Sequence, residues 1–303
     1  MTIQYHAGER RAQELAGLRP QAEHARPAIG TSIPAVAARF VAEQHFLVLG
    51  AADPEGRMWA SLLVGEPGFA AAPDEFTLDI AAVPVEGDPL RSVLTQSASV
   101  GAILIDPATR RRMRVNGDAE PTATGQRVAV RQVYANCPKY IQQRRIDHAE
   151  PAGSGPARVA EALDEAQQML IASADTFFVA TRSASGEADA SHRGGNSGFV
   201  EVLGERSLRW PDYVGNAMMM TLGNLQEDPA AGLLFVDWKT GVTLQVSGRA
   251  KVEWQADPAI PGAQRQVTFA IDRVVQLDRG SPLAWSAPVP SRFNPPLPEG
   301  TQN

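Results

Sequence analysis

The chain repeats its own sequence pattern at a nearly constant offset. Residues 46–49 (FLVL) are matched by residues 177–180 (FFVA), and Asn116-Gly117 is matched by Ser247-Gly248. The offset between matching residues stays at 130 or 131 over this whole stretch. Such a constant register predicts two copies of one small domain. Because the copies carry different polar residues, a ligand held between them needs only one complete set.

The length and composition agree with two globular domains. At 303 residues the chain fits two domains of about 100–150 residues, each large enough to bury its own core. Apolar residues make up 44% of the chain and charged residues 20%, which is typical of a globular protein rather than a disordered one. The net charge of −6 argues against nucleic-acid or anionic-membrane binding, so any anion site must be a focused basic patch.

The cysteine and histidine content argues against a metal site. Cys137 is the single cysteine, and the five histidines show no HExxH motif and no paired metal-ligand spacing. No apolar run approaches the roughly 18–20 residues of a membrane span, and residues 1–11 are polar where a secretory signal is apolar. We therefore expect a soluble, cytoplasmic protein with no metal and no membrane partner.

Short apolar runs separated by Gly, Pro or Asp predict a mainly β protein with some α-helix. We expect an N-terminal arm (1–31), a first domain (32–149), a linker (150–156), a second domain (157–287) and a proline-rich tail (288–303). The strands expected in the first copy are 46–51, 57–64, 76–81, 100–105 and 112–116. Those expected in the second copy are 176–182, 187–192, 199–203, 207–210, 232–236, 242–247 and 267–275. Such short, evenly spaced strands favour a small barrel in each copy.

Each copy is also expected to open with a helix. Ser32 and Pro34 resemble a helix start in the first copy. In the second copy, apolar residues recur at helical spacing from Val159 to Leu170, and the helix is expected to run to Ala172. The arm before Ser32 carries charge and little periodicity, so it is expected to pack on the body or stay mobile.

One polar cluster lies at the end of a strand expected in the second copy. Ser191, His192 and Arg193 precede Gly194, which begins a glycine-rich turn. Glycine lets a backbone approach a ligand closely, and an arginine fork suits a phosphate. A flexible hairpin with an exposed arginine has the same pattern, so the motif alone does not decide between the two interpretations.

A second cluster joins the next strand to a methionine-rich segment. Asp212 and Asn216 carry groups that hydrogen-bond the polar edge of a ligand. A helix beginning near Asn216 would point its backbone N–H groups toward a phosphate. An ordinary capped helix with residues 218–220 (MMM) in the core also fits this sequence.

A basic strand distinguishes the first copy from the second. Arg112, Arg114 and Asn116 share one face of the expected strand. A solvated strand edge is the usual reason for such a run, but the second copy has uncharged residues at the matching positions, so the fold does not require the charge. Beyond this strand, Lys139 is a candidate anion contact, whereas Cys137 has no partner base that the spacing identifies.

Together these clusters resemble the pyridoxamine 5′-phosphate oxidase-like superfamily, whose members are FMN-binding split β-barrels. One branch carries D-x-S-x-R-G-x-x-x-G-F-V, matched by residues 189–200, and P-D-x-x-G-N, matched by residues 211–216. It also carries L-R-V-N-G, matched by residues 113–117 with a Met for the Leu, and C-x-K, matched by residues 137–139. The resemblance implies two tandem split β-barrel domains that form an intramolecular pseudo-dimer.

The resemblance further implies one FMN per chain, because each copy keeps only part of the family's motifs. The second copy would contribute Ser191, His192, Arg193, Gly194, Asp212 and Asn216, and the first copy Arg112, Arg114, Asn116 and Lys139. The mirror-related site, where the first copy has Leu62-Leu63, would be empty. The branch often continues as G-N-N-R, but here Ala217-Met218 follow Asn216, so one polar and one basic contact are missing.

The function that the resemblance implies is an FMN-dependent oxidoreductase, with a small-molecule substrate or a separate reductase as electron donor. His192 is the candidate proton donor near neutral pH. The single cysteine excludes an iron–sulfur cluster held by this chain. The alternatives are a non-catalytic flavin- or haem-binding protein, with His192 or His148 as the haem ligand, and a protein that uses a deazaflavin. A pseudo-dimer within one chain fits both a monomer and a homodimer.

Overall fold

The computed structural model describes residues 3–149 and 156–297, whose strands form two large antiparallel sheets of the same topology. The strands of the first half are β1 (Phe46–Ala52), β2 (Met58–Val64), β3 (Ala70–Ala71), β4 (Thr77–Ile80), β5 (Ala98–Asp106), β6 (Arg111–Pro121) and β7 (Gln126–Ala135). Those of the second half are β9 (Arg158–Ala160), β10 (Thr176–Arg182), β11 (Ala188–Gly194), β12 (Glu201–Gly204), β13 (Ser207–Asp212), β14 (Ala230–Val236), β15 (Thr243–Glu253) and β16 (Arg265–Leu277).

The order of the strands confirms the duplication. The first sheet runs β2-β1-β5-β6-β7-β4-β3, and the second runs β11-β10-β14-β15-β16-β13-β12 with β9 added beside β16. Each strand of the first sheet therefore has one counterpart at the same place in the second. Both sheets carry a register shift at the matching dipeptides Asn116-Gly117 and Ser247-Gly248. An added Cβ would lie 2.1 Å from a carbonyl oxygen at Gly117 and 2.0 Å from one at Gly248, so both bulges need glycine.

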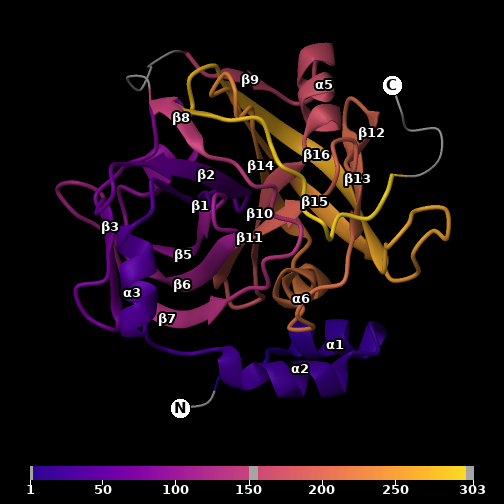
Figure 1. Ribbon diagram of the computed structural model, residues 1–303, viewed down its shortest axis with the longest axis horizontal. Coiled ribbons are helices and arrows are strands. Elements are labelled where there is room, and N and C mark those ends of the chain that lie inside the picture. Colours follow the sequence, from indigo (N-terminus) through magenta and orange to yellow (C-terminus); the bar gives the residue numbers. More distant parts are fainter. Residues whose placement is uncertain (1–2, 150–155, 298–303) are drawn as a thin grey trace.

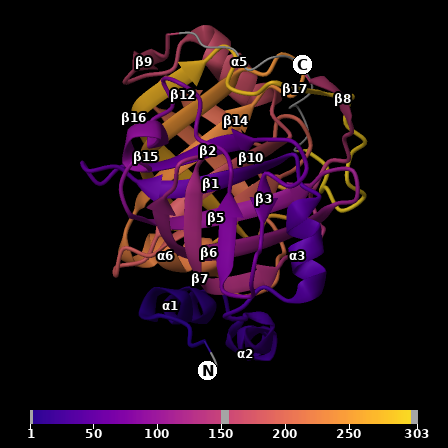
Figure 2. The same cartoon turned by 90° about the vertical axis from the view of Figure 1, so that its left-hand side faces the viewer.

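The two halves pack face to face around a shared apolar layer (Figures 1 and 2). Along β1, Leu47 and Leu49 point into the core of the first half, while Phe46 and Val48 point into the shared layer. This alternation follows from the two-residue period of a strand. The halves approach closely where Gly50 meets Ala180, its counterpart in β10, because a Cβ on Gly50 would lie 2.6 Å from the Cβ of Ala180.

Each sheet is covered by short helices. These are α3 (Ala35–Ala42) and α4 (Leu90–Val93) in the first half, and α5 (Glu165–Ser173) and α6 (Met220–Glu227) in the second. The helix expected from Ser32 begins at Ala35, after Pro34. The helix expected from Val159 is partly wrong, because Val159 lies on β9 and pairs with β16, and Asp164 caps α5.

The N-terminal arm is helical, which the sequence did not indicate. It forms α1 (Ala7–Leu15), α2 (Arg19–Ala25) and the short 3-10 helix η1 (Arg26–Ala28). Helix α1 lies against α6, below the two sheets in Figure 1. The backbones touch at Gly8, where an added Cβ would lie 2.2 Å from the carbonyl oxygen of Gly223. Small residues at this contact replace the apolar stripe that usually signals a helix.

The remaining segments join the halves at the opposite end. Strand β8 (Ile146–Ala149) pairs with β17 (Leu283–Trp285), so a segment from each side of the expected linker forms one small sheet. Residues 150–155 of that linker and residues 298–303 of the tail lie outside the described residues. Within the described part of the tail, Val289 forms an isolated bridge with Gln143. No helix in the described ranges is long and apolar enough to cross a membrane.

Candidate cofactor site

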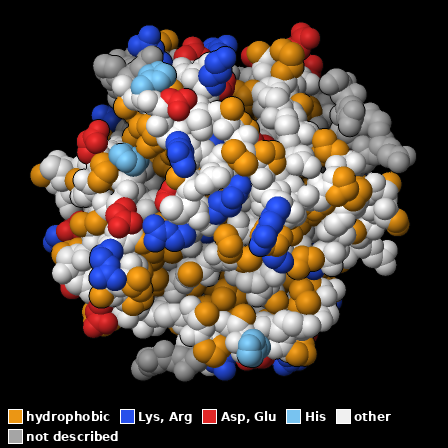
Figure 3. All heavy atoms as spheres, viewed as in Figure 1, with side chains coloured by type: hydrophobic (Ala, Val, Ile, Leu, Met, Phe, Trp, Pro, Cys, Tyr) orange, Lys and Arg blue, Asp and Glu red, His pale blue; other side chains and the backbone are white. Residues whose placement is uncertain are grey.

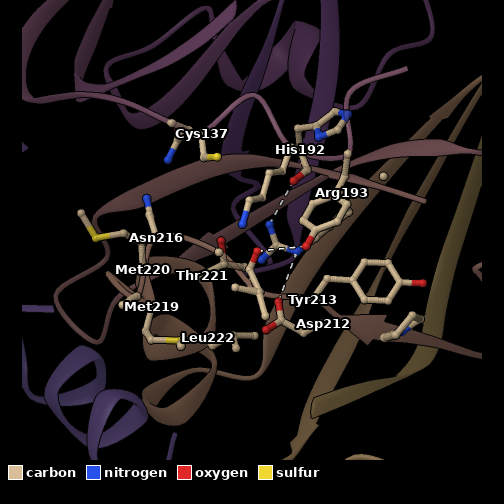
Figure 4. Close-up of a pocket in the computed structure, with 18 of the residues that line it drawn as sticks. Cys137, His192, Arg193, Asp212, Tyr213, Asn216, Met219, Met220, Thr221 and Leu222 are labelled. Atoms are coloured by element: carbon tan, nitrogen blue, oxygen red, sulfur yellow. Dashed lines mark hydrogen bonds and ion pairs between the residues drawn. The ribbon is translucent and has the colours of Figure 1, made fainter. Parts of the chain in front are cut away.

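A polar pocket lies between the two halves. Strand β6 and the segment after β7 form its wall from the first half, and β11, the end of β13 and the start of α6 form its wall from the second. Figure 4 shows His192 and Arg193 on one side of the view, with Cys137, Asn216 and Met219 on the other. On the face seen in Figure 3, Lys and Arg side chains lie across the middle of the molecule.

Most of the residues predicted to bind a cofactor meet in this pocket. Eight of the ten line it: Arg112, Arg114, Lys139, His192, Arg193, Gly194, Asp212 and Asn216. Ser191 does not, because it is fully buried beneath the wall, where it accepts a hydrogen bond of 2.6 Å from Arg193 Nη1. Asn116 does not either, because it faces a different cavity. Ser191 and Asn116 thus lie outside the lining of this pocket, next to residues that form it.

Arginines of the first half reach into the second half at this pocket. Arg112 Nη1 lies 2.7 Å from His192 Nδ1, and Arg112 Nη2 donates to the carbonyl oxygen of Cys137 at 2.8 Å. Arg114 Nη1 donates to Asp189 Oδ2 at 2.9 Å, and its Nη2 donates to Ser191 Oγ. The pocket wall is therefore assembled by contacts that only the pair of halves provides.

The charges in this wall are unevenly compensated. Asp189 pairs with Arg114, and Asp212 pairs with Arg265 at 2.9 Å and with Arg193 at 3.9 Å. Arg112 forms no ion pair with a carboxylate among the described residues, and its two hydrogen bonds go to neutral groups. Burial, with the nearby charges of Arg114 and Arg193, lowers the pKa of Arg112 to about 9. An anion bound next to Arg112 would stabilise the charged form of its guanidinium.

His192 is held in its neutral form. Burial, then the charges of Arg112 and Arg193, lower its pKa well below the usual 6.5. Because a guanidinium only donates, Nδ1 of the ring must accept from Arg112, which leaves the proton on Nε2. These surroundings argue against the expected proton donor near neutral pH, and they make His192 a hydrogen-bond donor through Nε2.

Several buried polar atoms of the pocket residues have no partner among the described residues. They are Arg112 Nε, Arg114 Nε, His192 Nε2 and Asn136 Oδ1. Leaving such groups unpaired costs about 1–3 kcal/mol each, so they are rare without a ligand or water to satisfy them. Three of the four are donors, which fits a ligand rich in acceptor oxygens, such as a phosphate.

Strained backbone is concentrated at the same pocket. Tyr140, Ala217 and Met219 line it, and all three have left-handed backbone angles, with φ of 65°, 64° and 60°. Residues other than glycine rarely adopt this conformation, and such strain clusters at functional sites. Because Ala217 and Met219 are left-handed, α6 begins at Met220 rather than near Asn216 as expected. Asn216 Oδ1 instead accepts from the backbone N–H of Met218 at 3.2 Å.

Some residues of the site were not predicted from the sequence. Tyr140 and Tyr213 lie at the pocket with their rings 5.2 Å apart. Both follow or lie within sequence motifs for which other residues were predicted as ligand contacts. Asp189 is the first residue of the D-x-S-x-R-G motif, but the motif predicted no ligand contact for it. Arg265 belongs to no motif. It reaches Asp212 only through the pairing of β13 with β16.

The mirror-related position lacks the charged set. Gln245 replaces Arg114 there, and its Nε2 donates to Ser61 Oγ and Asp88 Oδ2 at 3.0 Å each. Leu62 and Leu63 replace His192 and Arg193, and both are buried in apolar clusters. A polar link across the halves is thus kept, but Gln245 supplies no positive charge.

Comparison with known proteins places the second half in a family. Residues 163–267 match the model of the family described as pyridoxamine 5'-phosphate oxidase. No curated protein matches the chain in sequence.

Solved structures that compare with the chain cover about one of its halves. HupZ of Group A Streptococcus is 13% identical, with a TM-score of 0.33 over 40% of this chain and 98% of that one. An FMN-binding protein of Syntrophomonas wolfei is 13% identical, with a TM-score of 0.29 over 37% and 84%. A pyridoxamine 5'-phosphate oxidase-related, FMN-binding protein of Nostoc punctiforme is 12% identical, with a TM-score of 0.26 over 38% and 86%. The match of residues 163–267 covers most of the second half and supports the pyridoxamine 5'-phosphate oxidase-like superfamily for that half of the chain.

Proposed function

We propose that the chain binds one FMN in the pocket between its halves and acts as an FMN-dependent oxidoreductase. The observation that carries this proposal is the uncompensated positive charge of Arg112, next to buried donors that have no partner among the described residues. A phosphate dianion supplies both the missing charge and the missing acceptors. The match of residues 163–267 to the pyridoxamine 5'-phosphate oxidase family, in a superfamily known for FMN-binding split barrels, supports the same cofactor.

The charge balance favours a dianion over a neutral ligand. The cationic residues that line the pocket are Arg112, Arg114, Lys139, Arg193 and Arg265. They face Asp212, which also lines the pocket, and Asp189, which pairs with Arg114 behind it. Even with both carboxylates ionised, the positive charges exceed the negative ones. A phosphate monoester close to Arg112 would therefore be attracted by charge as well as by hydrogen bonds.

The pocket is small, so a flavin would extend beyond it toward solvent. Its volume is about 110 Å³, which is less than the ~150 Å³ cavity known to hold one benzene ring. Tyr140, Tyr213 and Val214 lie toward the open side, and Val214 is 47% exposed. Aromatic rings at this place suit contact with a flat conjugated ligand.

The protein's own contribution is binding, orientation and electrostatics. When bound, FMN supplies the redox chemistry, by accepting a hydride or electrons from a reduced donor and passing them to an acceptor. His192 Nε2–H and the guanidinium groups would hold acceptor atoms of the cofactor, while Asn136 Oδ1 would accept from a donor. The electron donor would be a small molecule or a separate reductase, since one cysteine cannot hold an iron–sulfur cluster.

Replacing a single arginine of the pocket tests whether FMN binds there. Arg112→Gln removes the guanidinium from the pocket, whereas Arg111→Gln removes one from the preceding residue of β6, whose side chain is 55% exposed and faces Glu43. Titration of the cofactor-free protein with FMN, followed by flavin fluorescence, should give a weaker Kd for Arg112→Gln by about 10- to 100-fold, as expected for one charge-assisted hydrogen bond. Arg111→Gln should bind like the wild type. Equal affinities for all three proteins would count against this site.

A further inference from the structure

A second polar cavity lies beneath the N-terminal arm. Its walls come from α1, β6, β7, β11 and α6, and its volume is about 190 Å³. Helix α1, which packs on α6 (Figure 1), contributes Glu9 to its wall. The Arg114–Asp189 pair separates it from the pocket described above, because Arg114 lines that pocket and Asp189 lines this cavity. The two spaces therefore have different polar groups to offer.

Asn116 presents a free acceptor to this cavity. Its Nδ2 donates to Asp189 Oδ1 at 3.1 Å and to Gln132 Oε1 at 3.4 Å, so the amide orientation is fixed. The side chain is only 8% exposed, and its buried Oδ1 has no partner among the described residues. The group that satisfies this oxygen must be a donor.

Glu9 adds a buried carboxyl to the same cavity. It is 5% exposed, and its Oε2 accepts from the backbone N–H of His6 at 2.9 Å. Its Oε1 lies 3.6 Å from His6 Nε2, and no Lys or Arg of the described ranges pairs with it. Burial and the nearby charges of Asp189, Glu227 and Glu187 raise its pKa to about 8. Repulsion among these carboxyls would be relieved by a positive charge placed between them.

The other charged groups at the cavity are already engaged. Arg131 is its one lining Lys or Arg among the described residues, and it pairs with Glu187 at 3.4 Å and with Asp118 at 3.2 Å. His6 lies 3.0 Å from Glu227 through Nδ1, and its Nε2 lies 3.0 Å from Asn224 Oδ1. The side chains of Arg131 and Glu187 are 36% and 52% exposed, so this side of the cavity reaches solvent.

We propose that this cavity binds a small organic cation whose N–H groups donate to Asn116 Oδ1 and to the carboxylate of Glu9. A planar amidinium or guanidinium fits this pair of acceptors, since it carries several N–H donors and a delocalised charge. The volume of about 190 Å³ exceeds the ~150 Å³ cavity that holds one benzene ring, so a cation of that size fits. This site is separate from the proposed cofactor and does not depend on it.

The geometry also sets the pH dependence of binding. Glu9 must be ionised to hold a cation, and it faces His6 on its own helix, Glu227 on α6, Asp189 and Glu187 at β11, and Arg131 on β7. Because its pKa is raised to about 8, the free protein holds this proton at neutral pH. Binding of a cation then releases a proton, and the affinity rises with pH up to about that value.

Benzamidine and benzamide form a matched pair of probes, because they share a shape and differ in charge. Isothermal titration of the full-length protein should show benzamidine binding at least about tenfold tighter than benzamide, with proton release in buffers of different ionisation enthalpy. Glu9→Gln should weaken benzamidine binding at least about tenfold and abolish the proton release. Glutamine also serves at this helix position, where Glu9 completes the capping box of α1, so the helix should remain.

Glu14→Gln serves as the control, because Glu14 lies on the same helix with an exposed side chain and does not line the cavity. This variant should bind benzamidine like the wild type. Equal binding of the two probes, unchanged binding to Glu9→Gln, or no heat up to about 10 mM benzamidine would overturn the proposal. Thermal unfolding of each variant separates loss of the site from loss of the fold.

Discussion

Arg114 of the first half and Asp189 of the second form a buried ion pair across the middle of the molecule, with Nη1 and Oδ2 2.9 Å apart. The two side chains are 9% and 5% exposed. Tyr134 donates to the other carboxylate oxygen at 2.8 Å, and Arg114 also bonds Tyr134, so the pair sits in a closed network. This network joins the halves and forms the floor between the proposed cofactor pocket and the second cavity.

Removing one member of this pair should strongly destabilise the protein. Asp189→Asn leaves the buried guanidinium of Arg114 without its carboxylate, and breaking such a pair costs about 3–5 kcal/mol. Asp278→Asn breaks an exposed pair with Arg158, whose side chains are 64% and 55% exposed, and should cost at most about 1 kcal/mol. Urea unfolding of the three proteins gives both differences. Similar losses for the two variants would contradict the role assigned to the buried pair.

The neutral state of His192 predicts a loss of stability in mild acid. Its pKa is lowered below the usual 6.5 by burial and by nearby arginines, so the unfolded chain binds a proton that the folded chain does not. The stabilisation is complete above pH 6.5 and is lost as the pH falls below it. His192→Gln should therefore lose less stability than the wild type between about pH 7.5 and pH 5.

The measurement for His192 is the free energy of unfolding in urea at both pH values, with cofactor-free protein. His24→Gln is the matched control, because His24 is exposed on α2. It should keep the pH dependence of the wild type. If His192→Gln also kept it, the ring would take up a proton in the folded protein as readily as in the unfolded chain, and Nδ1 could not be the acceptor assigned to it beside Arg112.

The glycines at the two matching bulges should be equally intolerant of a side chain. Gly117→Ala places a Cβ 2.1 Å from the carbonyl oxygen of Ala129, and Gly248→Ala places one 2.0 Å from that of Ala270. Relief of such overlaps typically costs about 1–3 kcal/mol. Gly30→Ala is the control, since its nearest neighbour would be at 3.6 Å. Thermal unfolding should rank both bulge variants well below Gly30→Ala, and a stable Gly117→Ala would mean that the bulge can relax.

The repeat made most of the sheet predictable from the sequence. The strand expected at 176–182 matches β10, and the other expected strands overlap their observed counterparts. Strand β7 was missed, because Gln126–Ala135 mixes charged and apolar residues along a half-exposed strand. The helices of the arm were missed because α1 packs through Gly8 and Ala12 rather than through large apolar side chains.

The candidate site was predictable as a cluster but not in its details. Residue types and family motifs brought together arginines of one half with His192 and Arg193 of the other. Sequence could not show that Ser191 lies beneath the wall, because that depends on which face of β11 meets β6. Nor could it show the left-handed backbone at Ala217 and Met219, which moves the start of α6 away from Asn216.

The single composite FMN site is tested most directly by the absorption spectrum of the purified protein, with identification and counting of the cofactor that heat releases. We predict a flavin spectrum and one FMN per chain, restored on adding FMN to cofactor-free protein. Two FMN per chain would contradict the single composite site. A Soret band from haem, or a colourless protein that does not take up FMN, would contradict the proposed cofactor itself.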